Sequence, residues 1–386
     1  MNKVFGDKII WWISILLCVA SILLVYTGGS SYITNHTVHV LIGVGIMYIF
    51  SRFNYKYFTN LSTILLVFSI ILLILLIIIP NNDIGIISTK SGRWIDLGFM
   101  NLQPSELAKY SLVLFLCRNF YIHRSILNSS ESASIQCLYI HILLPSFIVC
   151  VLILPFNFST SALIGCIVLF LIFISGFSLK WIFKWIFPPI TTLLVLIFLL
   201  LFYLPDNTLP RMTTWKNRIC AKEYKLLEHV LDCSNYDSKV YHNNQQVNRA
   251  LGAINRGGLV GVGAGKSQYK VILSQSKSDF IYAILLEEYG LIGGLVILFL
   301  YLFFYQRILI LSVKSHDDFP RLLLLGLGGV VLFQALLHMA VTTSLIPVTG
   351  QTLPLVSKGG SSILVTSLAF GIILNISHQI NRQEAK

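Results

Sequence analysis

The stretch LGAINRGGLVGVGAGKSQYKVILSQSKSDFIYAILLEEYGLIGG, residues 251–294, passes from a glycine-rich basic segment into a long apolar run. Asp279 stands at the start of that run, and Glu287 and Glu288 lie inside it. Charged side chains at bilayer depth cost roughly 2.5–3.5 kcal/mol each on insertion scales, so they usually face a cavity or a partner. The stretch therefore predicts a membrane helix with a site at its mouth for a polar group presented at the membrane surface.

The composition of the whole chain is that of a polytopic membrane protein. Its 386 residues are 55% hydrophobic and 11% charged, with a mean hydropathy of +0.78, which excludes a soluble globular protein. Apolar segments near the length needed to cross a bilayer recur at about residues 9–27, 38–51, 61–80, 105–120, 136–154, 160–178, 185–204, 280–304, 321–344 and 361–378. We therefore expect one all-α membrane domain over residues 1–386, with ten transmembrane helices.

The basic residues predict how these helices are oriented. Thirteen lysines and arginines fall in one alternate set of connections and at the termini, whereas the short connections of the other set carry only Lys90, Arg93 and Lys358. The positive-inside rule then puts both termini in the cytoplasm. Residues 81–104, 205–279 and 345–360 fall on the outer side, and 205–279 is a large extracytoplasmic loop before the eighth helix. The net charge of +12 is better explained by such anchoring charges and an anionic lipid than by nucleic acid.

The acidic residues inside or beside apolar segments are the candidates for chemistry. Asp279 has two interpretations: an ordinary helix N-cap, or a catalytic carboxylate at the membrane surface. Glu287 and Glu288 are better placed as partners inside the membrane, in an ion pair with Lys109 or in a hydrogen bond to a neighbouring helix.

A second group of polar residues lies in SGRWIDLGFMNLQPSELAK, residues 91–109. Gln103-Pro104-Ser105-Glu106 is typical of a helix start, with proline near the first position and an acid in the first turn. Arg93, in the preceding outer loop, is suited to bidentate binding of a phosphate. The alternative is that Arg93 and Glu106 only tie this loop to the helix bundle.

Two glycine-containing segments complete the candidates. GVGAGKS, residues 261–267, is not a P-loop, because Val260 stands where that motif requires glycine. Its glycines, with Lys266 and Lys270, form either an anion cradle or simply a flexible turn. LIPVTGQTLPLVSKGGSS, residues 345–362, predicts a non-helical re-entrant or outer loop that lines a cavity, with Lys358 as another phosphate contact.

Seven cysteines are scattered along the chain. Five lie in apolar segments and are interpreted as packing residues. Cys220 and Cys233 flank KEYKLLEHVLD, residues 222–232, which has the apolar spacing of a surface helix. Such a helix would hold the two thiols too far apart for a disulfide, so we expect free thiols.

Taken together, these segments resemble the SEDS family of shape, elongation, division and sporulation proteins, most closely its FtsW division branch. The similarity covers nearly the whole chain. It is carried by three signatures: Arg93-Trp94 with Gln103 to Glu106, then Asp279 to Ile281 with Glu287 to Gly290, and finally Pro347, Thr349, Gly350, Leu353, Pro354 and Gly359 to Ser362. The chain departs from the usual family pattern at Leu273 to Gln275, Asn157 to Thr160, His338, Lys358 and Arg249.

The resemblance implies a peptidoglycan glycosyltransferase that joins lipid II units at the outer face of the cytoplasmic membrane, at the division septum. It implies a class B penicillin-binding protein and other divisome proteins as partners, and no nucleic acid. Asp279 would be the general base on the acceptor hydroxyl. The pyrophosphate leaving group would be stabilised with or without a divalent cation such as Mg²⁺ or Mn²⁺, and no metal ligands are assigned.

The remaining residues take two roles under the same resemblance. Substrate contacts are expected from Arg93, Lys266, Lys270, Lys358 and Ser361. Positions lining the cavity or supporting the structure are expected at Gln103, Glu106, Lys109, Glu287, Glu288 and Thr349. The competing functions are a lipid II flippase, a RodA-like elongation polymerase and a noncatalytic division scaffold.

Overall fold

The computed structural model describes residues 5–26, 33–78, 94–96, 101–127, 131–177, 184, 188, 237–273, 275–346 and 348–384. The first half of the described chain forms helices α1 (Lys8–Tyr26), α2 (Ile33–Arg52), α3 (Lys56–Ile78), α4 (Pro104–Ile122), α5 (Arg124–Leu127), α6 (Glu131–Leu138), η2 (Tyr139–Leu143), α7 (Leu144–Ile153) and α8 (Phe158–Ile174). The second half forms α13 (Asp237–Gly257), α14 (Tyr269–Ile272), α15 (Ile281–Lys314), α16 (Asp318–Thr342) and α17 (Gly360–Glu384).

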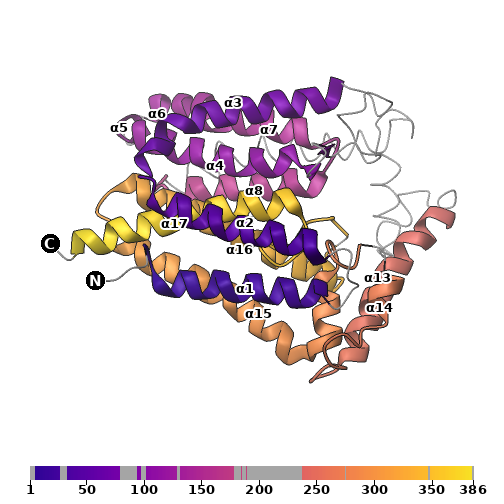
Figure 1. Ribbon diagram of the computed structural model, residues 1–386. Helices are drawn as coiled ribbons and strands as arrows, with labels where there is room; N and C mark the ends of the chain where they lie inside the picture. The colour runs from indigo at the N-terminus through magenta and orange to yellow at the C-terminus, as the bar shows by residue number, and fades with distance from the viewer. Residues whose placement is uncertain are drawn as a thin grey trace.

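The expected all-α membrane fold is confirmed. Nine of the ten predicted spans coincide with helices in the described part of the chain, where α6, η2 and α7 together form one of them. The remaining predicted span, 185–204, lies almost wholly outside the described residues. Six of the described helices are long and apolar enough to cross a membrane. Figure 1 shows the long helices packed side by side, with both termini at one end of the bundle and α13 at the other.

α16 and α17 form the centre of the bundle. In each, 83% of the residues in the spanning window are buried, compared with 28% in the outer helix α3. Small residues allow the close packing: a Cβ on Gly326 of α16 would come within 2.9 Å of Val113 on α4. Because lipid is as apolar as the helices, such close packing is a main source of helix association in membranes.

The N-terminus is fixed to the same centre by Asp7. This residue is only 4% exposed, and its carboxylate accepts hydrogen bonds from the first N–H groups of α1, 2.9 Å from Ile9 N. The other carboxylate oxygen accepts from Arg307 on α15 at 2.6 and 2.9 Å, and the Asp7 N–H donates to Ser377 on α17 at 2.9 Å. One acidic cap therefore joins the first, eighth and last predicted spans.

α15 is longer than its predicted span and is broken at Gly290, which has φ +67° and ψ −171° inside the helix. The glycine-rich segment 257–263 lies against this break. Val262 N and Gly263 N donate to the carbonyls of Glu287 and Glu288 at 2.9 and 3.0 Å, while Leu291 N donates to Gly258 O at 2.9 Å. The glycines considered for an anion cradle thus allow the backbone of this segment to lie close to the break in α15.

Two features differ from the sequence prediction. A two-stranded antiparallel hairpin, β1 (Ile95–Asp96) with β2 (Asn101–Leu102), precedes α4. The predicted outer loop also contains α13, which packs on α15. This helix was not predicted because its sequence is mostly polar. The predicted surface helix 222–232, with Cys220 and Cys233, lies outside the described residues.

The segment of residues 348–359, here called the central loop, is non-helical and enters the bundle between α16 and α17. Its residues 351–357 are all buried. The predicted non-helical segment is thus confirmed over these residues. Several of its carbonyls accept hydrogen bonds from side chains of α1, α15 and α16, which helps to satisfy irregular backbone inside a helix bundle.

Candidate functional site

A buried ion pair lies where α4 begins. Pro104 occupies the first turn of α4, and the Glu106 N–H donates to Gln103 O at 3.1 Å. Lys109 Nζ then lies 2.9 Å from Glu106 Oε2, and the two residues are 0% and 2% exposed. Since burying two charges is costly unless their remaining hydrogen bonds are satisfied, the neighbours of this pair decide its role.

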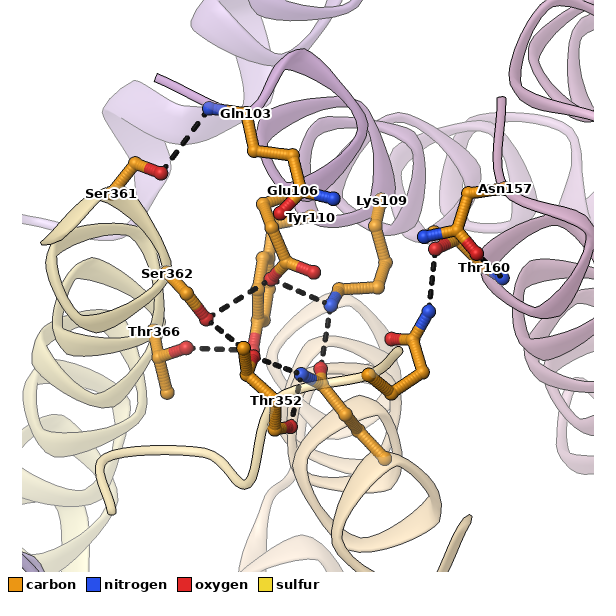
Figure 2. Close-up of polar contacts among 12 residues, drawn as sticks. Gln103, Glu106, Lys109, Tyr110, Asn157, Thr160, Thr352, Ser361, Ser362 and Thr366 are labelled. Atoms are coloured by element: carbon orange, nitrogen blue, oxygen red, sulfur yellow. Dashed lines mark hydrogen bonds and ion pairs between the residues drawn. The ribbon is translucent and has the colours of Figure 1, made fainter. Parts of the chain in front are cut away.

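Three other segments supply those neighbours (Figure 2). Lys109 Nζ donates to Gln334 Oε1 on α16 at 2.5 Å, and Gln334 Nε2 donates to the Thr352 carbonyl of the central loop at 2.9 Å. Thr352 Oγ1 lies 2.9 Å from Ser362 Oγ on α17, and this serine donates to Glu106 Oε2 at 3.5 Å. The network closes a ring through α4, α16, the central loop and α17.

A second polar cluster joins the central loop to α8. Gln351 Nε2 donates to Thr160 Oγ1 at 2.6 Å, and Gln351 O lies 2.8 Å from His338 Nδ1 on α16. Ser159 Oγ donates to Thr349 O at 2.9 Å. Two of the departures from the family pattern, Asn157 to Thr160 and His338, therefore meet around one loop.

Some buried polar atoms of this second cluster have no hydrogen-bond partner among the described residues. They are Asn157 Nδ2, His338 Nε2, Thr349 Oγ1 and Gln351 Oε1. A small cavity beside Asn157 is lined by this residue, Gln103 and Ser105 together with apolar side chains. Buried polar atoms are normally satisfied in proteins, so these donors and acceptors are suited to a polar group or to water.

Asp279 lies in the turn 275–280 that leads into α15. The N-cap position of α15 is Phe280, and no side chain caps it, so the alternative interpretation of Asp279 as the N-cap is wrong. Asp279 N donates to Gln275 O at 3.1 Å, and Gln275 itself has a left-handed φ of +63°. A non-glycine residue held there is strained, and such strain persists where the surroundings enforce it, often at functional sites.

The central loop contacts this turn directly. Lys358 N donates to Lys277 O at 2.8 Å, and Ser357 Oγ donates to Ser278 O at 2.7 Å. The pKa of Lys358 is lowered, first by burial and then by the positive charge of Lys277. The segments that carry Lys277, Asp279 and Lys358 therefore meet at the end of the bundle where α13 and α14 lie (Figure 1).

Glu287 and Glu288 pair with residues other than Lys109. Arg256 Nη1 and Gln268 N donate to Glu287 Oε1 at 2.8 and 3.0 Å, and Ser267 Oγ donates to its other oxygen. Glu288 Oε1 lies 3.6 Å from Lys270 Nζ. Both acids hold the glycine-rich segment and α14 against the broken helix, and the predicted ion pair with Lys109 is wrong.

The other predicted site residues are distributed as follows. Gln103 N donates to Ser361 Oγ at 3.2 Å, which fixes Ser361 at the start of α4 (Figure 2). Lys270 is buried, and its Nζ donates to Leu24 O on α1, whereas Lys266 is exposed. Arg93 lies outside the described residues.

Sequence reasoning did not single out Gln334 or Thr352, although both complete the Glu106 and Lys109 network. Gln334 lies in the apolar run VVLFQALLHM, and a polar residue inside a membrane helix is itself a signal of this kind. Thr352 had no such signal, because its role depends on the path of the central loop.

These features define an integral membrane protein with many spans, a buried loop at its centre and, at one end, a contact between that loop and the turn that holds Asp279. The chain belongs to the family of cell cycle proteins that comprises FtsW, RodA and SpoVE, whose sequence model matches residues 9–382.

Curated relatives match over nearly the whole chain. A probable peptidoglycan glycosyltransferase FtsW of Coxiella burnetii is 29% identical, over 90% of this chain and 87% of that one. One from Dichelobacter nodosus is 32% identical, over 81% and 73%. Stage V sporulation protein E of Bacillus subtilis is 28% identical, over 97% and 98%.

Solved structures share the fold. The rod shape determining protein RodA of Thermus thermophilus superposes with a TM-score of 0.65 at 21% identity, covering 98% of each chain. A chain from a structure described as a peptidoglycan synthase complex that coordinates polymerization and crosslinking superposes with a TM-score of 0.72 at 20% identity, covering 97% of this chain and 98% of that one.

Proposed function

We propose that this protein is a peptidoglycan glycosyltransferase that polymerises lipid II at the outer face of the cytoplasmic membrane during cell division. The observation that carries the proposal is the contact between the turn holding Asp279 and the central loop holding Lys358. It brings the segment that carries Asp279 and Lys277 against the segment that carries Lys358, at one end of the helix bundle. The relatives named as peptidoglycan glycosyltransferases support the choice of substrate.

In the proposed mechanism, Asp279 accepts the proton of the acceptor sugar hydroxyl while that oxygen attacks the anomeric carbon of the donor. The bond from that carbon to the lipid pyrophosphate breaks, and the departing pyrophosphate gains negative charge. Lys277 lies in the same turn as Asp279, and Lys358 lies in the loop that contacts this turn; both would stabilise this charge through electrostatic preorganisation. Arg93 is proposed to contribute in the same way.

The buried networks position these groups. The central loop is held in the bundle by the network of Glu106, Lys109, Gln334 and Thr352. Ser357 of the same loop bonds to the turn that holds Asp279. Within the described residues, Asp279 is not part of any group of three closely spaced metal-ligating side chains. A divalent cation bound to the pyrophosphate would add to the stabilisation of its charge.

The proposed partner is a class B penicillin-binding protein, with other divisome proteins at the septum. The support is the fold shared with a chain of a peptidoglycan synthase complex. Activity of the purified protein with and without such a partner separates an intrinsic polymerase from one that requires activation.

The decisive experiment is polymerisation of labelled lipid II by purified Asp279→Asn protein, followed on gels. The substitution keeps the shape of the side chain and removes the base, so we expect a loss of about 10²–10⁴-fold or more. Glu106→Gln, which weakens a buried ion pair, should retain part of the activity. Wild-type rates in Asp279→Asn would refute the assignment of the base.

A lipid II flippase is the competing function, because ion pairs buried between helices also occur in transporters. Movement of labelled lipid II across vesicles containing the wild-type protein, without polymer formation, would favour it. Polymer formation that depends on Asp279 excludes a function limited to transport.

A further inference from the structure

The end of the bundle opposite the proposed active site holds a cluster of three metal-binding side chains. They are His123, at the C-terminus of α4, Cys137 on α6 and His141 in η2. One ligand atom from each residue lies within 4.8 Å of those of the other two. This is the one such group among the described residues, and α6 lies at the same end of the bundle as both termini (Figure 1).

We propose that His123, Cys137 and His141 form a zinc-binding site that joins the end of α4 to α6 and η2. Two imidazole nitrogens and a thiolate are a ligand set that borderline-soft divalent metals prefer, and Zn²⁺ is the common example. Three protein ligands leave a fourth tetrahedral position for water or another group.

The ligand atoms lie close enough to share a metal ion after rotation of the side chains. With Zn–N of about 2.0–2.1 Å and Zn–S of about 2.3 Å, ligand atoms around a tetrahedral zinc lie roughly 3.3–3.6 Å apart. The observed limit of 4.8 Å requires closing by about 1 Å, which side-chain rotation supplies. The two imidazole rings stack, with centroids 4.2 Å apart and an angle of 21° between their planes, so one ring must rotate out of the stack before both can bind the same ion.

The backbone holds the two histidines in place. η2 is a π-helix inserted between α6 and α7, and such widened turns are rare and frequently occur at functional sites. Asn119 Nδ2 on α4 donates to His141 O at 3.1 Å, and His123 N donates to Asn119 O at 2.9 Å. One asparagine therefore fixes both histidine backbones.

The cysteine is positioned by the neighbouring connection. Ser134 Oγ donates to the carbonyls of Ile126 and Leu127 at 3.0 and 3.1 Å, which ties α6 to α5 directly after His123. Cys137 is 7% exposed, one turn beyond Ser134. The site is thus built from a preformed corner of the fold.

The alternative is a stacked imidazole pair beside a buried thiol, with no metal. The test uses full-length protein purified with a tag that lacks histidine and given zinc alone. Metal content by mass spectrometry should approach one zinc per chain. Replacing zinc with cobalt should give the charge-transfer absorption of a cobalt–thiolate bond.

Matched variants locate the site. Cys137→Ser and His141→Asn should each reduce zinc affinity by at least about tenfold, since even loss of groups that only orient metal ligands costs 10–100-fold. Cys166→Ser and His316→Asn, at exposed positions, should leave it unchanged. Zinc should also raise the thermal unfolding midpoint of the wild type and of these two controls only.

Three results would overturn the proposal. They are wild-type protein that holds no zinc, zinc that Cys137→Ser and His141→Asn both retain, and cobalt spectra without a thiolate band. If one variant fails to fold, the other variant and the wild-type spectrum still decide the question.

Discussion

At the scale of single residues, buried charge has the strongest consequences. Lys270 is 7% exposed, and burial lowers its pKa while the carboxylate of Glu288 opposes that change. Its Nζ also donates to a carbonyl of α1. Removing either partner leaves the other charge buried without its counter-charge, which is costly.

Lys270→Met is therefore expected to destabilise the protein by about 3–5 kcal/mol. Adding Glu288→Gln removes the charge left behind, so the double variant should lose less than the sum of the two single losses. Thermal unfolding in detergent, with Lys266→Met as an exposed control, measures this. Additive losses would show that the two groups do not interact.

Lys358 gives a prediction about pH. Because its pKa is lowered, it loses its proton at a lower pH than an exposed lysine does. If its positive charge stabilises the pyrophosphate, polymerisation should fall on the alkaline side of the pH profile. Lys358→Arg keeps its charge throughout that range and should move the fall to higher pH.

The control for this profile is Lys314→Arg, a partly exposed residue paired with Glu384 at 3.0 Å at the opposite end of the bundle. It should leave the profile unchanged. An alkaline limb that is the same in wild type and Lys358→Arg would assign the titration to another group.

Sequence reasoning at this scale selects residues by their type and place alone. Glu106 and Lys109 were expected to support the structure, and they form a buried pair. Asp7 was not among the candidates from the sequence, because its partner Arg307 is 300 positions away. No local pattern reports such a pairing.

At the scale of elements, the break at Gly290 determines the shape of α15. Its φ and ψ fall in a region that is essentially restricted to glycine, and an added Cβ would lie 2.3 Å from Leu259 O. Substitution there is strained both by conformation and by a backbone contact.

Gly290→Ala should therefore destabilise the protein by at least about 1–3 kcal/mol from the conformational term alone. Gly45→Ala in α2 is the matched control, since its added Cβ meets nothing within 4 Å, and alanine favours a helix by about 0.5–1 kcal/mol over glycine. Unfolding midpoints of the two variants should move in opposite directions. A neutral Gly290→Ala would mean that the break is not required.

Hydrophobic run length predicted where helices lie but not where they break. The Gly290 break depends on segment 257–263 lying alongside it, which is a tertiary contact. The same reasoning missed η2, because a π-turn has no distinct hydropathy. His123, Cys137 and His141 lack a recognised metal-binding spacing, so only the fold brings them together.

At the scale of the whole molecule, the two termini share one end of the bundle (Figure 1). The distribution of basic residues predicts that this end is cytoplasmic. Green fluorescent protein fused after the C-terminus should then fluoresce, and alkaline phosphatase fused there should be inactive.

The same phosphatase fused within residues 205–279 should be active, because that loop is predicted to be extracytoplasmic. Active phosphatase at the C-terminus would reverse the orientation and place the proposed active site on the wrong side for polymerisation.

The central loop also constrains the order of biosynthesis. Ser21 on α1 donates to Val356 O, Thr160 on α8 accepts from Gln351, and Tyr301 on α15 donates to Pro354 O at 2.5 Å. The ribosome makes these three helices before it makes the loop. Until the loop is synthesised, the nascent chain in the translocon or the lipid therefore lacks the native hydrogen bonds of these hydroxyl groups. A message truncated before residue 348 would yield a chain that inserts but cannot close its interior, a natural target for membrane proteolysis.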